Sequence, residues 1–179
     1  MSTALDLGVS TDLLRRFDVP GPRYTSFPTA DRFVEAFGPD DCLQALHQRR
    51  HGGAGAALPL SLYVHIPFCE SLCYYCACNK IVTRHHAHAA PYLDYLLREM
   101  DLYVQALGSG HTVSQLHLGG GTPTFLSDAE LGRLMAAVRE RFTLAPGGEY
   151  SVEVDPRTVD AGRLAALAPD ALASVRLGL

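Results

Sequence analysis

Four of the five cysteines in the chain lie within one stretch of ten residues, at Cys69, Cys73, Cys76 and Cys78. The C-x3-C-x2-C spacing of the first three puts three thiolates around one loop, which suits three corners of a cubane iron-sulfur cluster. The fourth iron would then have no protein ligand and would stay open for a substrate or cofactor to chelate. We therefore predict a [4Fe-4S] cluster that takes part in chemistry as well as carrying electrons.

Two other interpretations of these cysteines stay open at this point. A four-thiolate zinc site is one, although structural zinc usually draws together two separated ligand pairs and the chain has no second pair at zinc-finger spacing. Fortuitous buried cysteines are the other. In a cytosolic protein a cluster this dense favours metal binding or catalysis over disulfides. Cys42 lies apart on a predicted amphipathic helix and is interpreted as a small core residue without a role.

A glycine run and an acidic residue mark two further loops. Gly119, Gly120 and Gly121 precede Thr122 between a predicted strand and a predicted helix, without the lysine of a P-loop or the spacing of a dinucleotide fold. Such a run lets the backbone approach a ligand closely, and a tight turn without a ligand is the alternative. Glu153 ends a strand that is otherwise apolar, where a carboxylate can accept hydrogen bonds from a ribose or an amine.

Several neighbouring polar residues receive no role from the sequence alone. A surface carboxylate that caps the next helix is the alternative for the acidic loop, and it fits Asp155 better than Glu153. His65 and His117 lie on predicted strands and could equally be satisfied core residues. Neither histidine is included among the predicted site residues.

The stretches between these loops alternate between strand and helix patterns. Short runs rich in strand formers occur at residues 61–66, 113–118, 150–154 and 174–179. Apolar residues at helical spacing predict helices at 88–107, 127–142 and 159–167. Alternation of this kind predicts an α/β fold with a parallel sheet and right-handed crossovers. Ligands bind at the carboxyl ends of such strands, which here are the loops that begin at Pro67, Gly119 and Asp155.

The beginning of the chain has a different character. We expect an N-terminal extension over residues 1–57 and a core domain over residues 58–179, with a glycine-rich linker at 51–56 as the boundary. The extension carries two predicted helices, at 11–17 and about 40–50. Between them, prolines and a glycine at 20–28 forbid a continuous helix or a central strand.

Composition limits the classes of partner. The 179 residues have a formal net charge of -4 and a hydrophobic fraction of 47%, which is typical of a globular protein and disfavours nucleic acid as a partner. No apolar run approaches the roughly 18 to 20 residues that span a bilayer, and the first residues lack the features of a secretory signal. We expect a cytoplasmic protein without a membrane or nucleic-acid partner.

Long strings around the motifs resemble a known family. The cysteine spacing after a first strand, with the aromatic Tyr75 before the third cysteine, is the signature of the radical S-adenosylmethionine (SAM) superfamily. The strings YVHIPFC at 63–69, CACNKIVTR at 76–84 and GPRYTSFPTA at 21–30 are similar to the oxygen-independent coproporphyrinogen III oxidase family. Related haem chaperone-like proteins usually carry Phe at the position of Cys78.

The resemblance implies a specific set of cofactor contacts. Cys69, Cys73 and Cys76 would ligate the [4Fe-4S] cluster. The glycine run, including Gly120, would bind the amino group of the SAM methionine portion, and Tyr63 and Glu153 would contact the same SAM. A second SAM in the active site would be contacted by the remaining three matched residues, Tyr75, Gly121 and Thr122. No catalytic residue is implied beyond the cluster and SAM sites.

The resemblance also implies a fold, a reaction and partners. The fold would be a parallel (β/α) partial barrel of the radical SAM type, of which this chain would hold the N-terminal half, about three β/α units. The reaction would convert two propionates of coproporphyrinogen III to vinyl groups, giving protoporphyrinogen IX in haem biosynthesis. We expect a monomer that takes electrons from a flavodoxin-type or ferredoxin-type protein. The alternative is an inactive truncated fragment, or a cluster-binding or haem-binding chaperone-like module without turnover.

Overall fold

The computed structural model describes residues 10–18, 29, 32–52, 55–74, 76–167 and 174–177. The chain divides into two units, Met1–Pro39 and Asp40–Leu179. The first contains helix α1 (Thr11–Phe17), which begins where the Ser10 side chain accepts a hydrogen bond from the Leu13 amide. This helix confirms the prediction for residues 11–17, whereas the proline-rich stretch at 20–28 lies outside the described residues. The predicted domain boundary at 57/58 stays a prediction.

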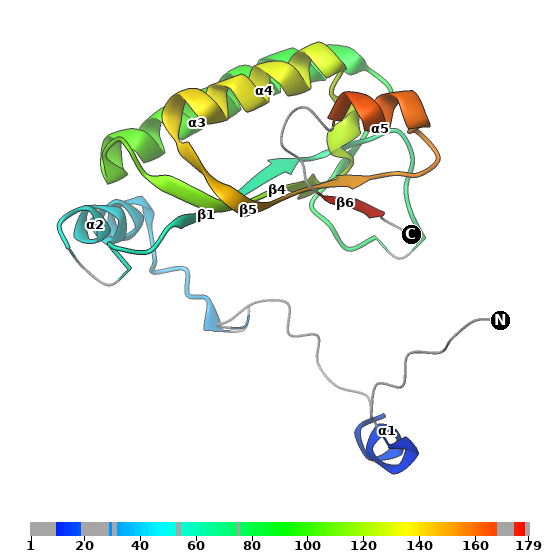
Figure 1. Cartoon of the computed structure of the whole chain (residues 1–179), viewed down its shortest axis with the longest axis horizontal. Helices are drawn as coiled ribbons and strands as arrows, with labels where there is room; N and C mark the ends of the chain where they lie inside the picture. The colour runs from blue at the N-terminus through cyan, green and yellow to red at the C-terminus, as the bar shows by residue number, and fades with distance from the viewer. Residues whose placement is uncertain are drawn as a thin grey trace. The chain divides into compact units, whose positions relative to one another are not determined.

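The second unit is built on a parallel sheet of four strands in the order β1-β4-β5-β6 (Figure 1). The strands are β1 (Leu60–Ile66), β4 (Thr112–Gly120), β5 (Thr143–Val154) and β6 (Ser174–Leu177). Each predicted strand is present, and the sheet is parallel as predicted. Within the described residues the sheet is open, with β1 and β6 at its edges, which is the arrangement expected of a partial barrel.

Strand β5 begins seven residues before the predicted start at Tyr150. Thr143 and Leu144 pair with Thr112 and Val113 of β4, the register then shifts, and regular pairing resumes at Glu149. The intervening Pro146-Gly147-Gly148 sequence is typical of a turn. The strand pairing at Thr143 and Leu144 could therefore not be predicted from the sequence.

Three helices lie over one face of this sheet (Figure 1). They are α3 (Ala89–Leu107), α4 (Asp128–Arg141) and α5 (Ala161–Leu167), and helix α2 (Pro39–Arg50) lies near the beginning of β1. The core between helices and sheet contains Val64 and Ile66 of β1, Leu116 and Leu118 of β4, and Val152 of β5, all buried. No helix in the described part of the chain has the length and apolar character needed to cross a membrane.

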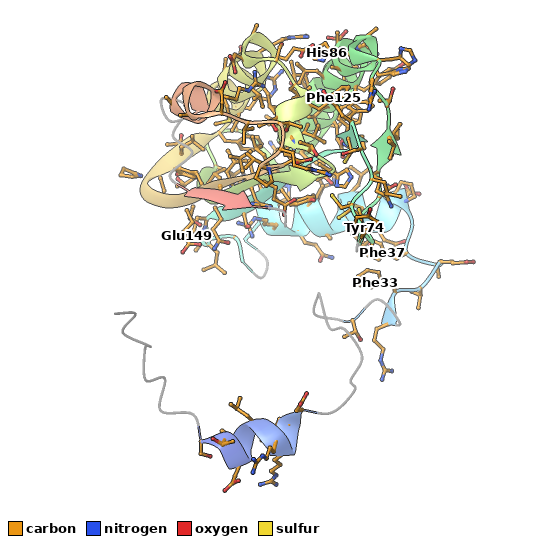
Figure 2. All side chains as sticks on the ribbon, turned by 90° about the vertical axis from the view of Figure 1, so that its right-hand side faces the viewer. Phe33, Phe37, Tyr74, His86, Phe125 and Glu149 are labelled. Atoms are coloured by element: carbon orange, nitrogen blue, oxygen red, sulfur yellow. The ribbon has the colours of Figure 1, made fainter. Side chains whose placement is uncertain are left out.

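The opposite face of the sheet is polar because alternate residues of a strand point to opposite faces. Tyr63 of β1 is 59% exposed and lies between the half-buried Leu62 and the buried Val64. His117 of β4 pairs in register with Tyr63. Figure 2 shows Glu149 of β5 on the side of the sheet away from His86 and Phe125. A polar surface thus runs along three strands toward their carboxyl ends.

Helix α4 begins with the predicted capping box. The Glu130 amide donates to the Ser127 hydroxyl, and Glu130 Oε2 accepts from the Ser127 amide at 2.8 Å. His86 Nε2 lies 2.8 Å from the same carboxylate oxygen, and its ring stacks on Phe125 in the short helix η3 (Pro123–Phe125). Burial by itself raises the pKa of Glu130, but the hydrogen bonds from Ser127 and His86 outweigh it, so the pKa lies below its usual value.

We expect Glu130→Ala to lower the free energy of unfolding at pH 7 by about 1 kcal/mol, because it removes the carboxylate that accepts the hydrogen bond from the Ser127 amide. A carboxyl whose pKa is lowered on folding adds stability above its unfolded pKa of about 4.3 and loses it as the pH falls through the folded pKa. The difference from the parent protein should therefore shrink between pH 7 and pH 3 in urea unfolding. Glu140→Ala, at an exposed carboxylate of the same helix, is the control and should change little. A difference in unfolding free energy between Glu130→Ala and the parent that stays constant with pH would contradict a capping role for the Glu130 carboxylate.

Candidate functional site

The loop that carries the cysteines is closed at its base by a second, two-stranded parallel sheet. Strand β2 (Phe68–Cys69) pairs with β3 (Ile81–Val82), neither of which was predicted. The Ile81 amide donates to Pro67 O at 2.7 Å, and the Thr83 amide donates to Cys69 O at 2.8 Å. Loop residues 70–80 are thereby held at both ends directly after β1.

Phe68 anchors this base in the hydrophobic core. It is buried, and its ring centroid lies 5.1 Å from that of Phe125 and 5.4 Å from that of Tyr92, the latter edge to face. The Tyr92 hydroxyl of α3 donates to His65 O at 2.6 Å. Packing of Phe68 therefore fixes the position of the adjacent Cys69 against the end of the sheet.

The three predicted cluster ligands line a common cavity of about 150 Å³. Cys69 is buried, Cys73 and Cys76 are half-buried, and the Cys76 amide donates to Cys73 O in a turn. The Thr122 hydroxyl lies 3.6 Å from Cys69 Sγ. Burial, and to a lesser degree the neighbouring thiols, raise the pKa of Cys69. Its thiol is therefore protonated at neutral pH in the free protein, and a metal that binds must displace the proton.

This donor set fits a cubane cluster. Among the residues that the structure describes, no three His, Cys, Asp or Glu side chains converge on a point that would hold a single metal ion. The thiolates of a cubane each bind a different iron and need only surround one cavity, as these three do. The identity of the three ligands stays a prediction.

The glycine loop faces the same cavity, and two of its amides already donate hydrogen bonds within the protein. The Gly121 amide donates to Ile66 O at 2.8 Å, and the Thr122 amide donates to Phe68 O at 2.8 Å. A Cβ on Gly121 would lie 2.7 Å from both Pro67 O and Phe68 O, so only glycine fits this crossing of the two loops. Because these two amides already donate within the protein, their part of the loop offers a ligand carbonyl oxygen, an acceptor that suits an amino group.

The other two glycines make room for side chains rather than for backbone. A Cβ on Gly119 would meet His117 Nε2 at 3.0 Å and the Tyr63 ring at 3.1 Å, and a Cβ on Gly120 would meet the His65 ring at 2.7 Å. Gly120 also has a φ of 111°, which other residues rarely adopt. The glycine run therefore serves both the turn and the packing of three ring side chains from β1 and β4.

Glu153 is part of a hydrogen-bonded group on the polar face. Its Oε1 lies 3.1 Å from His117 Nε2, while His117 Nδ1 lies 2.7 Å from the buried Ser151 hydroxyl. The Tyr63 ring stacks on His117, with centroids 5.7 Å apart, and its hydroxyl lies 3.2 Å from His65 Nδ1. Burial, and next the charge of Glu153, raise the pKa of Tyr63, so its hydroxyl stays neutral.

The two histidines of this group, His65 and His117, were not among the predicted site residues. The signal that could have found His65 is strand alternation, because it lies two residues after Tyr63 and therefore on the same face. His117 could be found only from the strand register, which pairs it with Tyr63 and with Ser151.

An ion pair borders the cysteine loop from the end of β5. Arg157 donates from Nε and Nη2 to both oxygens of Asp155, at 2.9 and 2.7 Å, and its Nη2 lies 3.6 Å from Cys73 Sγ. The hydrogen bonds from Arg157 hold the pKa of Asp155 below its usual range. The pair places the Arg157 guanidinium beside the thiol of a predicted cluster ligand, where it can stabilise negative charge on the sulfur. Arg157 was not predicted, because 84 residues separate it from Cys73.

Seven of the nine predicted site residues line the one cavity: Cys69, Cys73, Cys76, Gly120, Gly121, Thr122 and Glu153. Tyr63 lies outside its lining and reaches the group through His117. Tyr75 lies outside the described residues. Cys78 also lines the cavity and is exposed, and Cys42 is half-buried on α2 rather than in the core.

The chain matches proteins of one family in sequence and in structure. Residues 63–179 match the model of the radical SAM superfamily. The chain is 51% identical over 151 residues to the oxygen-independent coproporphyrinogen III oxidase of Pseudomonas aeruginosa, covering 83% of this chain and 32% of that protein. It is 43% identical over 144 residues to the protein of that name from Mannheimia haemolytica, covering 80% of this chain and 94% of the relative.

The fold agrees with a solved structure of coproporphyrinogen III oxidase (HemN) from Escherichia coli, a radical SAM enzyme. The TM-score is 0.78 at 43% sequence identity, and the match covers 93% of this chain and 35% of that one. The chain thus spans about a third of the length of the P. aeruginosa and E. coli proteins. On the superfamily match and on the identity to the M. haemolytica protein, the chain belongs to the radical SAM superfamily, within its oxygen-independent coproporphyrinogen III oxidase family.

Proposed function

We propose that this chain acts as an oxygen-independent coproporphyrinogen III oxidase and binds its [4Fe-4S] cluster and SAM in one cavity. Membership of the radical SAM superfamily implies a [4Fe-4S] cluster and SAM as cofactors. The observation that carries the proposal is the single cavity at the carboxyl ends of β1, β4 and β5. The thiols of Cys69, Cys73 and Cys76, the glycine loop and the Glu153 carboxylate are among the groups that line it.

Each group in the cavity has a distinct part in the proposal. Cys69, Cys73 and Cys76 bind three irons and leave the fourth open. The carbonyl oxygens of the glycine loop accept from the SAM amino group, since the Gly121 and Thr122 amides are already donated. Glu153 accepts hydrogen bonds from the same SAM. When bound, the reduced cluster and SAM supply a 5'-deoxyadenosyl radical that can abstract hydrogen from a carbon.

The substrate in the proposal is coproporphyrinogen III, after the name of the relatives. Each of two propionate side chains loses a hydrogen atom from its β carbon to the radical, then loses carbon dioxide and passes one electron to a one-electron acceptor such as the oxidised cluster, and becomes a vinyl group. The protein binds and orients the substrate and keeps water and oxygen from the radical. Tyr63 contributes to the first SAM site, and Tyr75, Gly121 and Thr122 to a second SAM. A flavodoxin-type or ferredoxin-type donor, a monomeric state and a cytoplasmic location complete the proposal.

Turnover under anaerobic conditions tests this function. The reconstituted chain is mixed with dithionite, SAM and coproporphyrinogen III, and the products are separated by liquid chromatography with mass detection. We expect methionine, 5'-deoxyadenosine and vinyl-bearing porphyrinogen from the parent chain, and none of them from Cys73→Ser.

Two outcomes would overturn parts of the proposal separately. Cleavage of SAM without any vinyl product would refute the substrate and leave the cofactors in place. A chain loaded with its cluster that cleaves no SAM would refute the enzyme and favour the chaperone-like alternative.

A further inference from the structure

His117 links two of the predicted SAM contacts, although they come from different strands. It lies on β4, the strand between β1 and β5, and its ring reaches both neighbours. On one side it stacks on Tyr63 with an interplanar angle of 29°. On the other, Nε2 is 3.1 Å from Glu153 Oε1. The imidazole is only 24% exposed, so the ring has little freedom to move away.

The partners of the ring decide where its proton lies. A carboxylate can only accept hydrogen bonds, so Nε2 must carry hydrogen and donate to Glu153. The buried Ser151 hydroxyl can then donate to Nδ1 at 2.7 Å. A neutral imidazole with hydrogen on Nε2 therefore satisfies both contacts, and the tautomer follows from the hydrogen-bond network.

We infer that His117 is a positioning residue for SAM: it holds Glu153 Oε1, so that the other carboxylate oxygen is the one offered to the ligand, and it backs the Tyr63 ring. This inference rests on the proposed function, because it concerns how the same SAM site is kept in order. Glu153 lines the cavity with the three cysteines, whereas His117 is set back from it. The role is therefore indirect, through the orientation of the carboxylate.

The chain offers a matched control on the same strand and face. Gln115, two residues before His117, donates from Nε2 to Glu149 Oε2 at 3.1 Å. In both pairs a side-chain N–H on β4 faces a carboxylate on β5, but the Gln115 pair lies away from the cavity. If weakening of the sheet lowers SAM affinity, substitution of either His117 or Gln115 should lower it. If His117 positions the SAM contacts, only substitution of His117 should lower SAM affinity.

The test compares four variants for SAM affinity after anaerobic reconstitution, by isothermal titration calorimetry, with iron content and melting temperature as further readouts. His117→Gln keeps a donor near the position of Nε2. His117→Asn can place its amide only near Nδ1 and loses the bond to Glu153. We expect the Kd for SAM to rise about tenfold in His117→Asn and His117→Leu, equivalent to about 1.4 kcal/mol. His117→Gln should stay within about threefold of the parent, Gln115→Leu should leave the Kd unchanged, and iron content should be equal throughout.

The possible results distinguish failure of the inference about His117 from failure of the proposed function. Equal Kd values for His117→Asn and His117→Gln would overturn the inference, even if His117→Leu failed to fold. An equal loss of SAM affinity in Gln115→Leu would also overturn it. A parent chain that holds its iron and binds no SAM would instead refute the proposed function.

Discussion

Replacing Cys73 with serine is expected to remove the iron of the reconstituted chain almost completely, from about four irons per chain in the parent to background. Cys73 is one of the three predicted cluster ligands that line the cavity, and an alkoxide at this place is a far poorer iron ligand than a thiolate. The loss should appear in iron and sulfide analysis and in the visible absorbance of the cluster.

Two further cysteine variants make this prediction specific. Cys78→Ser alters the exposed fourth cysteine of the loop, and Cys42→Ser alters the half-buried cysteine of α2. A cubane held by three thiolates predicts that both retain their iron. Loss of metal from Cys78→Ser as complete as that from Cys73→Ser, together with bound zinc instead of iron, would establish the four-thiolate zinc alternative.

Gly121→Ala should damage both the fold and the SAM site. The added Cβ would lie 2.7 Å from two backbone carbonyl oxygens, Pro67 O and Phe68 O. The backbone cannot yield as a flexible side chain can, so the two loops must move apart. That movement strains the hydrogen bonds that the Gly121 and Thr122 amides donate to Ile66 O and Phe68 O. We expect the free energy of unfolding to fall by about 1 to 3 kcal/mol, as for overpacking elsewhere.

The same substitution is expected to abolish SAM binding at concentrations that saturate the parent, because the glycine carbonyls would leave their places. Gly132→Ala is the matched control, since Gly132 lies on α4 with no atom within 4 Å of the added Cβ. It should raise stability by about 1 kcal/mol, as alanine favours a helix. A Gly121→Ala chain as stable as the parent in urea unfolding, with unchanged Kd for SAM, would refute the claim that the close approach of the two loops requires glycine at this position.

The fold could be predicted from sequence wherever a local pattern decides the structure. Strand β1 alternates polar and apolar residues because one face is buried under helices. Helix α4 begins at a capping box that four consecutive residues encode, from Ser127 to Glu130. Pairing between β2 and β3 could not be predicted, because two-residue strands carry no pattern and depend on closure of the loop around Phe68.

The candidate site divides in the same way. The cysteines and the glycine run are local in sequence, so their spacing alone indicated a cluster and a ligand loop. His117 and Arg157 became visible only in three dimensions, through strand register in one case and a contact across 84 residues in the other. Gly119 and Gly120 were interpreted as backbone for a ligand, whereas the structure shows that they also make room for His117, Tyr63 and His65.

In the proposed function, SAM binds in this cavity directly to the open iron of a cluster held by Cys69, Cys73 and Cys76. Electron-nuclear double resonance on the reduced, reconstituted chain tests it, with SAM that carries nitrogen-15 in the amino group and oxygen-17 in the carboxylate. We expect hyperfine coupling from both labels to the cluster, because chelation puts both atoms on the open iron. A reduced cluster that shows no coupling to either label at saturating SAM would contradict it.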